Sequence, residues 1–203
     1  MDPIDTLTQL LRELPGIGPR QGRRIAHAIA KKHPSWSSRL VAALQNTQRN
    51  VTHCTQCMRL HTQKNNNPLC SICTNHHRTG STLLLVEKDA DLENIERTGT
   101  YTGHYFVLGG TTSPRAQLPA QDIAIEKLEA RIQNTEHPVT EIIFALSATT
   151  EGADTERFVR AQIEGKPYMT AVTISTLGRG LSTGSELEYV DSDTMQNALK
   201  GRR

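Results

Sequence analysis

The chain has 203 residues, 36% hydrophobic and 4% aromatic, which is enough for one or two compact domains with a buried core. It lacks the apolar run of roughly 20 residues that a membrane span needs, and its N-terminus lacks the basic region of a signal peptide. We therefore expect a cytoplasmic protein. Residues 1–80 hold eleven Lys/Arg against three Asp/Glu, a net charge of +8, whereas residues 81–203 hold twelve against eighteen, a net charge of −6. This asymmetry indicates a polyanion-binding first part, with chance grouping of surface charge as the alternative.

The first 52 residues are predicted to be helical. Apolar residues recur at helical spacing from Ile4 to Leu14, and the segment LPGIGP then breaks the pattern. Pro19 suits the first turn of a second helix, because its missing N–H leaves no hydrogen bond unmade there. On that helix, apolar and cationic side chains separate onto two faces. The apolar face holds Gly22, Ile25, Ala26 and Ile29, and the cationic face holds Arg20, Arg23, Arg24, His27 and Lys31. A third helix is predicted over residues 33–51.

The segment LPGIGPRQGRRIA matches the helix-hairpin-helix motif of nucleic-acid-binding proteins. Gly16 and Gly18 allow a tight turn and expose amides at a helix N-terminus, where a phosphate oxygen can bind. Three cations follow at once: Arg20, Arg23 and Arg24. Such contacts hold the DNA backbone without reading bases, so we expect sequence-independent, salt-dependent binding to single-stranded or double-stranded DNA. The alternative is a plain interhelical turn. Gly22 is interpreted as a site of close helix packing.

All four cysteines lie in one short polar segment: Cys54, Cys57, Cys70 and Cys73. Two Cys-x2-Cys pairs separated by twelve residues predict a closed tetrahedral site for one structural Zn²⁺ per chain. Metal binding would also explain how residues 53–78 fold with almost no core. Two disulfides are the main alternative, disfavoured without a secretory signal, and an iron–sulfur cluster is a second. The nearby histidines are expected at the surface, not as ligands: His53, His61, His76 and His77.

From residue 81 onward, strands and helices alternate. Strands are predicted over residues 81–87, 104–110, 141–147 and 169–176, and helices over residues 89–99, 119–134 and 154–165. Gly99 is expected to close the first of these helices. The alternation predicts a parallel sheet covered by helices. The last 27 residues read as a Gly-rich loop and one short helix.

The first predicted strand ends in a run of carboxylates: Glu87, Asp89 and Asp91. This arrangement resembles the Toprim domain of primases and topoisomerases, in which such a Glu acts with an Asp-x-Asp pair after a later strand to hold Mg²⁺. Aligned on Glu151, the two aspartate positions here hold Ser147 and Thr149, and hydroxyls are poor Mg²⁺ ligands. The basic half also has no tyrosine to act as a nucleophile, and the four later tyrosines are expected to be packing residues. The domain is therefore predicted to be non-catalytic.

The order of these parts resembles the RecR family of bacterial recombination mediators over the whole chain. Matching strings are LPGIGP, the two Cys-x2-Cys pairs, IERTG, YFVLGG, TEG and SELEYVD. The chain departs from the family at residues 147–149, where many members have Asn-Pro-Thr, and at residues 117–121. The role of the loop 111–121 stays open. The resemblance implies an α+β multi-module fold: a helix-hairpin-helix DNA-binding and oligomerisation region (1–52), a four-Cys zinc finger (53–78), a degenerate Toprim domain with a parallel sheet (79–176) and a C-terminal tail (177–203).

The resemblance also implies what the protein does. RecR proteins act in RecF-pathway repair of gapped DNA, with RecO and in some species RecF, to load recombinase onto single-stranded DNA. It implies a ring-like homotetramer, cytoplasmic and associated with the nucleoid. It further implies that Glu87 and Asp91 face a protein partner rather than a metal, with a merely solvated acidic face as the alternative.

Two functional classes follow. The leading hypothesis is a DNA-binding scaffold that is not an enzyme. The alternative is a Mg²⁺-dependent nuclease or primase-like enzyme that uses Glu87, Asp89 and Asp91, with Glu151 as an added ligand. A dinucleotide-binding protein is a third, minor hypothesis, because the glycines of GRGLSTG (178–184) have the wrong spacing and follow the last strand.

Overall fold

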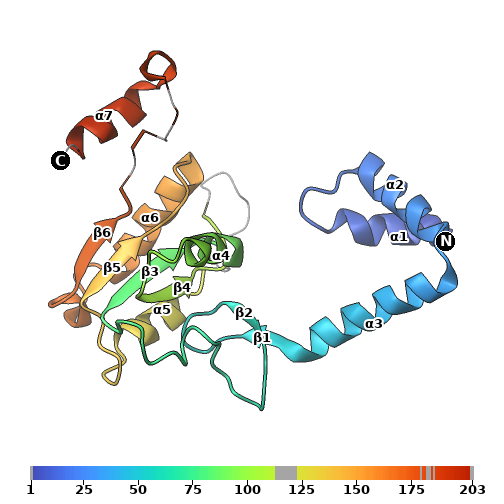
Figure 1. The fold of residues 1–203 in the computed structure, drawn as a ribbon, viewed down its shortest axis with the longest axis horizontal. Helices are drawn as coiled ribbons and strands as arrows, with labels where there is room; N and C mark the ends of the chain where they lie inside the picture. The colour runs from blue at the N-terminus through green and yellow to red at the C-terminus, as the bar shows by residue number, and fades with distance from the viewer. Residues whose placement is uncertain (1, 113–122, 179, 182–183, 185, 202–203) are drawn as a thin grey trace. The chain divides into compact units, whose positions relative to one another are not determined.

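A computed structural model of the chain describes residues 2–112, 123–178, 180–181, 184 and 186–201 (Figure 1). The chain divides into two compact units, Met1–Val51 and Thr52–Arg203. Across the described ranges, no helix combines the length and the apolar character required to cross a bilayer.

The first unit is helical, as predicted. Its described residues form α1 (Pro3–Arg12), α2 (Pro19–Ala30) and α3 (Pro34–Asn50), each with a proline in its first turn. The α1 and α2 helices pack at Gly22, where an added Cβ would lie 3.1 Å from Arg12 Cγ and 3.3 Å from the Thr8 carbonyl oxygen. Both separations are tighter than ordinary contacts, so the packing role of Gly22 is confirmed. The turn between the helices uses Gly16 in a left-handed conformation, with φ of 78°.

The second unit contains two sheets. The smaller sheet pairs β1 (Val51–His53) with β2 (Leu60–Thr62). The larger sheet has the order β4-β3-β5-β6, formed by β3 (Thr82–Val86), β4 (His104–Val107), β5 (Glu141–Phe144) and β6 (Thr173–Thr176). Every pair in it is parallel, with Leu84 beside both Tyr105 and Ile143. The predicted parallel sheet is therefore confirmed.

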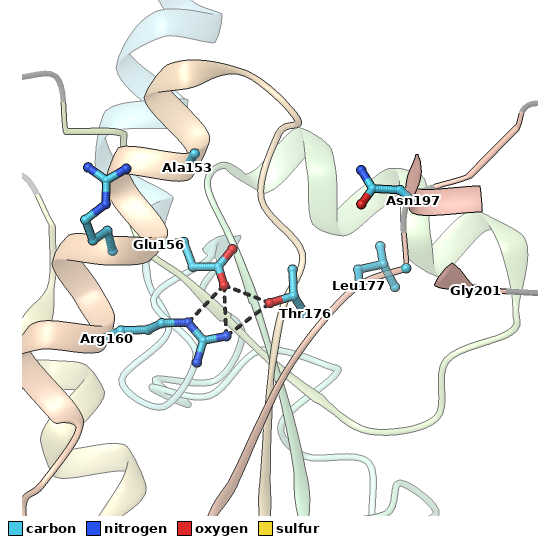
Figure 2. A pocket seen from close by; sticks show the side chains of 9 residues that line it. Ala153, Glu156, Arg160, Thr176, Leu177, Asn197 and Gly201 are labelled. Carbon is cyan, nitrogen blue, oxygen red and sulfur yellow. Dashed lines mark hydrogen bonds and ion pairs between the residues drawn. The ribbon is translucent and has the colours of Figure 1, made fainter. Parts of the chain in front are cut away.

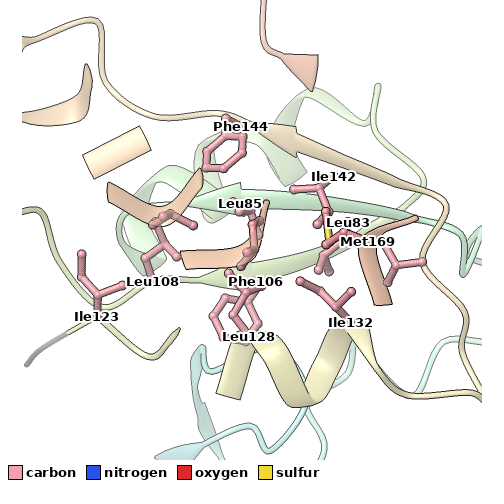
Figure 3. Close-up of a cluster of buried hydrophobic side chains, with 13 residues drawn as sticks. Leu83, Leu85, Phe106, Leu108, Ile123, Leu128, Ile132, Ile142, Phe144 and Met169 are labelled. Atoms are coloured by element: carbon pink, nitrogen blue, oxygen red, sulfur yellow. The ribbon is translucent and has the colours of Figure 1, made fainter. Parts of the chain in front are cut away.

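Helices cover both faces of the larger sheet. Because alternate β3 side chains point to opposite faces, they join two different cores. Leu83 and Leu85 join one core with α5 (Ile125–Ile132) and α6 (Thr150–Ile163), seen in Figure 3. Leu84 and Val86 join a second core with Leu92 of α4 (Asp89–Thr98) and with three of the cysteines. The remaining described elements are η2 (Pro167–Met169), η3 (Leu187–Tyr189) and α7 (Ser192–Lys200).

Several element boundaries differ from prediction for local reasons. The α6 helix begins four residues early, because the Thr149 hydroxyl caps it by accepting from the Gly152 N–H at 3.2 Å. Two short strands, β1 at the start of the cysteine segment and β2 within it, were not predicted from hydropathy. The α5 helix begins at Ile125, and residues 119–122 of its predicted range lie outside the described residues. Gly99 does close α4, in a left-handed conformation with φ of 65°.

Candidate functional site

The four cysteines converge on one point. Their Sγ atoms all lie within 4.8 Å of one another, and Cys57 Sγ is 3.6 Å from Cys70 Sγ. Tetrahedral coordination with Zn–S bonds of about 2.3 Å places sulfur atoms about 3.8 Å apart, so the cluster has the size of such a site. All four are free thiols, which disfavours the disulfide alternative, and only Cys73 is not fully buried.

Two similar turns position these sulfur atoms. In each, the residue after the second cysteine donates its N–H to the carbonyl of the first: Met58 to Cys54 at 2.9 Å, and Thr74 to Cys70 at 3.1 Å. The two turns are joined by the Cys70 N–H, which donates to Cys54 Sγ at 3.3 Å. N–H donation to sulfur stabilises a thiolate, which is the form that binds a metal.

Because the thiols lie so close together, their pKa values are shifted in opposite directions. Hydrogen bonds with Cys57 and Cys70 lower the pKa of Cys54. The corresponding hydrogen bonds with Cys54 and Cys57 raise the pKa of Cys73. A divalent cation favours the thiolate at all four positions, because each ligand must lose its proton to bind.

The cysteine segment is attached to the larger sheet. The Val107 N–H of β4 donates to the Cys57 carbonyl at 2.8 Å. Arg131 of α5 is 6% exposed and donates to the His137 carbonyl at 2.9 Å. Burial lowers the pKa of Arg131, and the nearby Cys73 and Cys57 thiolates act in the opposite direction. A divalent ion held by four thiolates carries net negative charge, so this cation is well placed to balance it.

The N-terminus of α2 has the features of an anion site. Gly18 caps the helix without a side-chain hydrogen bond, and the first turn contains no acidic residue. Arg20, Arg23 and Arg24 are all exposed. Arg23 Nη2 lies 3.4 Å from Asp5 Oδ1, an exposed pair of small energy. In the described part of the chain, the side chains of Arg20 and Arg24 make no ion pair or hydrogen bond, so both remain free to meet phosphates.

Glu87 is enclosed rather than exposed. Its side chain is 3% exposed, and its two oxygens accept from the Ser147 N–H at 2.8 Å and from Ser147 Oγ at 2.9 Å. Gly152 completes the enclosure, because a Cβ there would lie 2.0 Å from the Ser147 carbonyl oxygen and 3.1 Å from Glu87 Oε1. In the described chain Glu87 is therefore enclosed, and its carboxylate joins the end of β3 to the turn at Ser147; its role toward a protein partner stays a prediction.

The other two carboxylates have separate partners. Asp89 Oδ1 accepts from the Leu60 N–H at 2.9 Å, which ties α4 to β2. Asp91 Oδ2 accepts from the Lys88 N–H at 3.1 Å, at the start of α4. Of the residues that the structure describes, only the four cysteines form a His/Cys/Asp/Glu group compact enough for a metal. The arrangement that a Mg²⁺-dependent enzyme would need, with Glu87, Asp89 and Asp91 converging, does not occur here.

The two hydroxyl residues at the aspartate positions both have structural partners. Ser147 binds Glu87, and Thr149 caps α6. At these two positions, aspartates would hold a metal in a catalytic Toprim domain. The hydroxyls that replace them here instead make hydrogen bonds that join parts of the fold.

Sequence reasoning missed a partly buried network around Arg78. Its Nη2 is 2.5 Å from Glu96 Oε2, and its Nη1 donates to the Gly103 carbonyl at 2.8 Å. The Tyr105 hydroxyl donates to Glu96 Oε1 at 2.7 Å. This network joins the end of the cysteine segment to α4 and β4, and no local spacing marks it.

The tyrosine prediction holds for three residues and fails for one. The hydroxyls of Tyr101, Tyr105 and Tyr168 each donate to a partner within the sheet unit. Tyr189 is 79% exposed, so it is not a packing residue in the described chain. His61, expected at the surface, is half-buried.

A hollow of about 570 Å³ lies between α6, the end of β6 and α7 (Figure 2). Its charged groups are already paired. Arg160 Nε donates to Glu156 Oε1 at 2.9 Å, and the Thr176 hydroxyl donates to the same oxygen at 2.7 Å. Among the described residues that line the hollow, the acids and bases are thus paired with one another or with neighbours.

Comparison with known proteins agrees with this geometry. Residues 81–174 match the Toprim domain model, and residues 180–203 match the model for the RecR C-terminal region. The chain is 40% identical to "Recombination protein RecR" of Acidithiobacillus ferrooxidans, over 98% of this chain and 95% of the relative. It is 38% identical to the protein of that name from Rhodospirillum rubrum, over 98% and 96%, and 34% identical to one from Legionella pneumophila, over 100% and 96%. An identity of this size along the full length shows that the chain belongs to the RecR family of recombination proteins.

Proposed function

We propose that the chain is a non-catalytic DNA-binding protein of recombinational repair. The observation that carries this proposal is the N-terminus of α2, where open amides, exposed arginines and an absence of acidic first-turn residues coincide. The relatives support the context, because they are named recombination proteins. Gly16, Gly18 and the amides after them would receive a phosphate, and Arg20, Arg23 and Arg24 would contact the neighbouring phosphates.

These contacts hold the backbone alone. The proposed binding is therefore independent of sequence and weakens steeply with salt, as released counterions return to the DNA. Arg23 has to give up its pair with Asp5 to contribute, at small cost because both side chains are at least half exposed.

We propose that the four cysteines hold Zn²⁺, one ion per chain. The sulfur spacing suits this ion, four thiolates form a closed donor set, and Arg131 would balance the excess negative charge. The ion would fix the turns at Cys54–Cys57 and Cys70–Cys73, and it would supply no reacting group, because no ligand position remains open to water.

The wider role rests on family resemblance. We propose that the protein acts in the cytoplasm, at the nucleoid, as a ring-shaped tetramer. It would act with RecO, and with RecF as in some species of the family, to load recombinase onto single-stranded DNA. Its division into a DNA-binding and oligomerisation region (1–52), a zinc finger (53–78), a Toprim domain (79–176) and a tail (177–203) belongs to this proposal. Since Glu87 is enclosed, the proposed partner contact falls to Asp91 and the surface of α4 around it.

DNA binding is tested by fluorescence anisotropy with a labelled duplex at several NaCl concentrations. The Arg20→Gln/Arg24→Gln protein should lose affinity, and the slope of log K against log salt should fall by about 1.8, or about 0.9 for each phosphate that is no longer neutralised. The matched control is Arg39→Gln/Arg49→Gln, which removes the same charge from the exposed face of α3. Equal loss of affinity in both proteins would show that charge alone acts, and that the α2 site does not exist.

The enzyme alternative is tested with supercoiled plasmid and Mg²⁺. We expect no nicking or relaxation by the wild-type protein. A topology change that disappears in Glu87→Ala would establish a catalytic Toprim site and overturn the non-catalytic proposal.

A further inference from the structure

We propose that a hollow beside β2 is a second phosphate-binding site, which receives a backbone phosphate of nucleic acid. The hollow has a volume of about 510 Å³ and lies wholly in the second unit. Its lining includes Arg59, His61 and Lys64. The anion site stands on this geometry alone, while the choice of nucleic acid over free phosphate rests on the proposed DNA-binding function.

The charge of the surrounding segment favours an anion. Residues 53–78 contain three Lys/Arg and four histidines but no Asp or Glu, and no lining residue of the hollow is acidic. Two carboxylates lie outside this lining: Asp89 Oδ1 accepts from the Leu60 N–H at 2.9 Å, and Glu93 Oε1 forms an ion pair with Arg59 Nη2 at 3.8 Å. The Glu93 side chain is 60% exposed and its contact with Arg59 is longer than a hydrogen bond, so a phosphate can compete with it for the arginine.

Two buried nitrogen atoms of the lining residues lack partners. Arg59 Nε and His61 Nε2 are both shielded from solvent and make no hydrogen bond with any described residue. The Arg59 side chain is only 18% exposed, so its charge is held near the hollow rather than free in water. A buried unpaired polar atom is unfavourable, and a phosphate offers several acceptor oxygens to nearby donors. Arg59 and His61 therefore each keep an unused hydrogen-bonding atom among the residues that line the hollow.

The rim is shaped by the asparagine run at 65–67. Asn65 and Asn66 adopt left-handed conformations, with φ of 53° and 55°, and the Asn67 N–H donates to the Lys64 carbonyl at 3.0 Å. Asparagine tolerates this conformation better than most residues. The turn places Lys64 and Asn67 on one rim of the hollow.

The hollow also has apolar surface, from Leu60 and Leu69. Leu60 is 45% exposed and Leu69 is half-buried. A sugar or base can pack on such surface, whereas an inorganic phosphate gains nothing from it. This combination favours a nucleotide unit over a free ion.

The first test uses the full chain, loaded with zinc, and a fluorescein-labelled single-stranded oligothymidine. Arg59→Gln/Lys64→Gln should bind about tenfold more weakly near 100 mM NaCl, as expected when a charge-assisted hydrogen bond is removed. The slope of log K against log salt should fall by about 0.7 for each phosphate that is no longer neutralised. The matched control is Lys127→Gln/Arg157→Gln, which removes two exposed cations from α5 and α6. Affinity and slope equal to those of this control would overturn the proposal.

Two further measurements separate the possible failures. Lys64→Gln alone changes an exposed side chain, so it reports on the site even where Arg59→Gln unfolds the segment. A thermal-shift titration at constant ionic strength then compares inorganic phosphate with the dinucleotide d(TpT). Stabilisation by d(TpT) that is lost in the double variant supports the proposal. Stabilisation by phosphate alone overturns the nucleic-acid assignment, and equal response of wild type and variant to both ligands overturns the site. Loss of DNA binding only in Arg20→Gln/Arg24→Gln would leave the α2 proposal standing while this one fails.

Discussion

Replacement of Glu87 provides a direct test of its structural role. The Glu87→Ala change removes the acceptors of the Ser147 N–H and hydroxyl in a place that is 3% exposed. Ser147 itself is exposed, so water can reach its two donors once the carboxylate is gone, and the loss of about 1 kcal/mol per hydrogen bond applies rather than the full burial penalty. With the lost packing of the buried Glu87 side chain added, we expect the free energy of unfolding to fall by about 2–3 kcal/mol. Glu87→Gln keeps one acceptor oxygen and most of the packing, so its loss should be smaller, about 1 kcal/mol.

Urea denaturation of the metal-loaded protein measures both losses. The Ser147→Ala change adds a control, because the double variant Glu87→Ala/Ser147→Ala should lose less than the sum of the two single losses. Mg²⁺ distinguishes the structural role from a catalytic one. A site with a Kd of about 1 mM would gain about 1.4 kcal/mol in 10 mM Mg²⁺, and we expect no such gain. Unchanged stability in Glu87→Ala, together with a Mg²⁺ gain present only in wild type, would refute the reasoning.

Three further changes test the packing, the charge network and the metal site. Gly22→Val should lower the stability of the first unit by about 1–3 kcal/mol, because the added methyl groups overpack the α1–α2 contact. Unfolding followed by circular dichroism measures the change in stability. Unchanged stability would contradict the close packing at Gly22. Burial opposes the charge on Glu96, but hydrogen bonds with Arg78 and Tyr105 lower its pKa below the ordinary 4.5. Since the folded pKa is the lower one, this stability is present above the unfolded pKa and lost as pH falls through the folded value. Urea midpoints should therefore drop below about pH 4.5, and less steeply in Glu96→Gln. Cys57→Ser should lower the metal content well below one ion per chain and should lower the melting temperature of the second unit. Metal analysis measures the first effect and calorimetry the second. A variant that still binds one ion per chain would exclude Cys57 as a ligand.

Local spacing in the sequence was enough to predict much of the fold. Two Cys-x2-Cys pairs predict a converging sulfur site, because each short turn already directs two sulfur atoms inward. The separation of apolar and cationic residues around α2 follows from helical periodicity, and the parallel sheet follows from alternating strands and helices. These features depend on residues close together in the chain.

The partners of the carboxylates could not be predicted in the same way. Ser147 meets Glu87 from 60 residues away, and the Leu60 N–H meets Asp89 from 29 residues away. In the sequence, Glu87, Asp89 and Asp91 form one acidic cluster that suggests an exposed surface. In the fold they point to three different partners, because a strand end, a helix start and a neighbouring turn meet there. Arg78 and Glu96 are likewise brought together only by tertiary packing.

The hydrogen bond between the Cys57 carbonyl and the Val107 N–H has a consequence for solubility. β4 is the outermost strand on its side of the larger sheet, and its residues are largely apolar. An uncovered edge strand offers unpaired backbone groups to a strand of another molecule and so invites aggregation. The turn at Cys57 shields part of that edge, and the proposed metal would hold this turn in place through the four sulfur atoms. Chelation or oxidation of the thiols should therefore cause the protein to precipitate before its sheet unfolds.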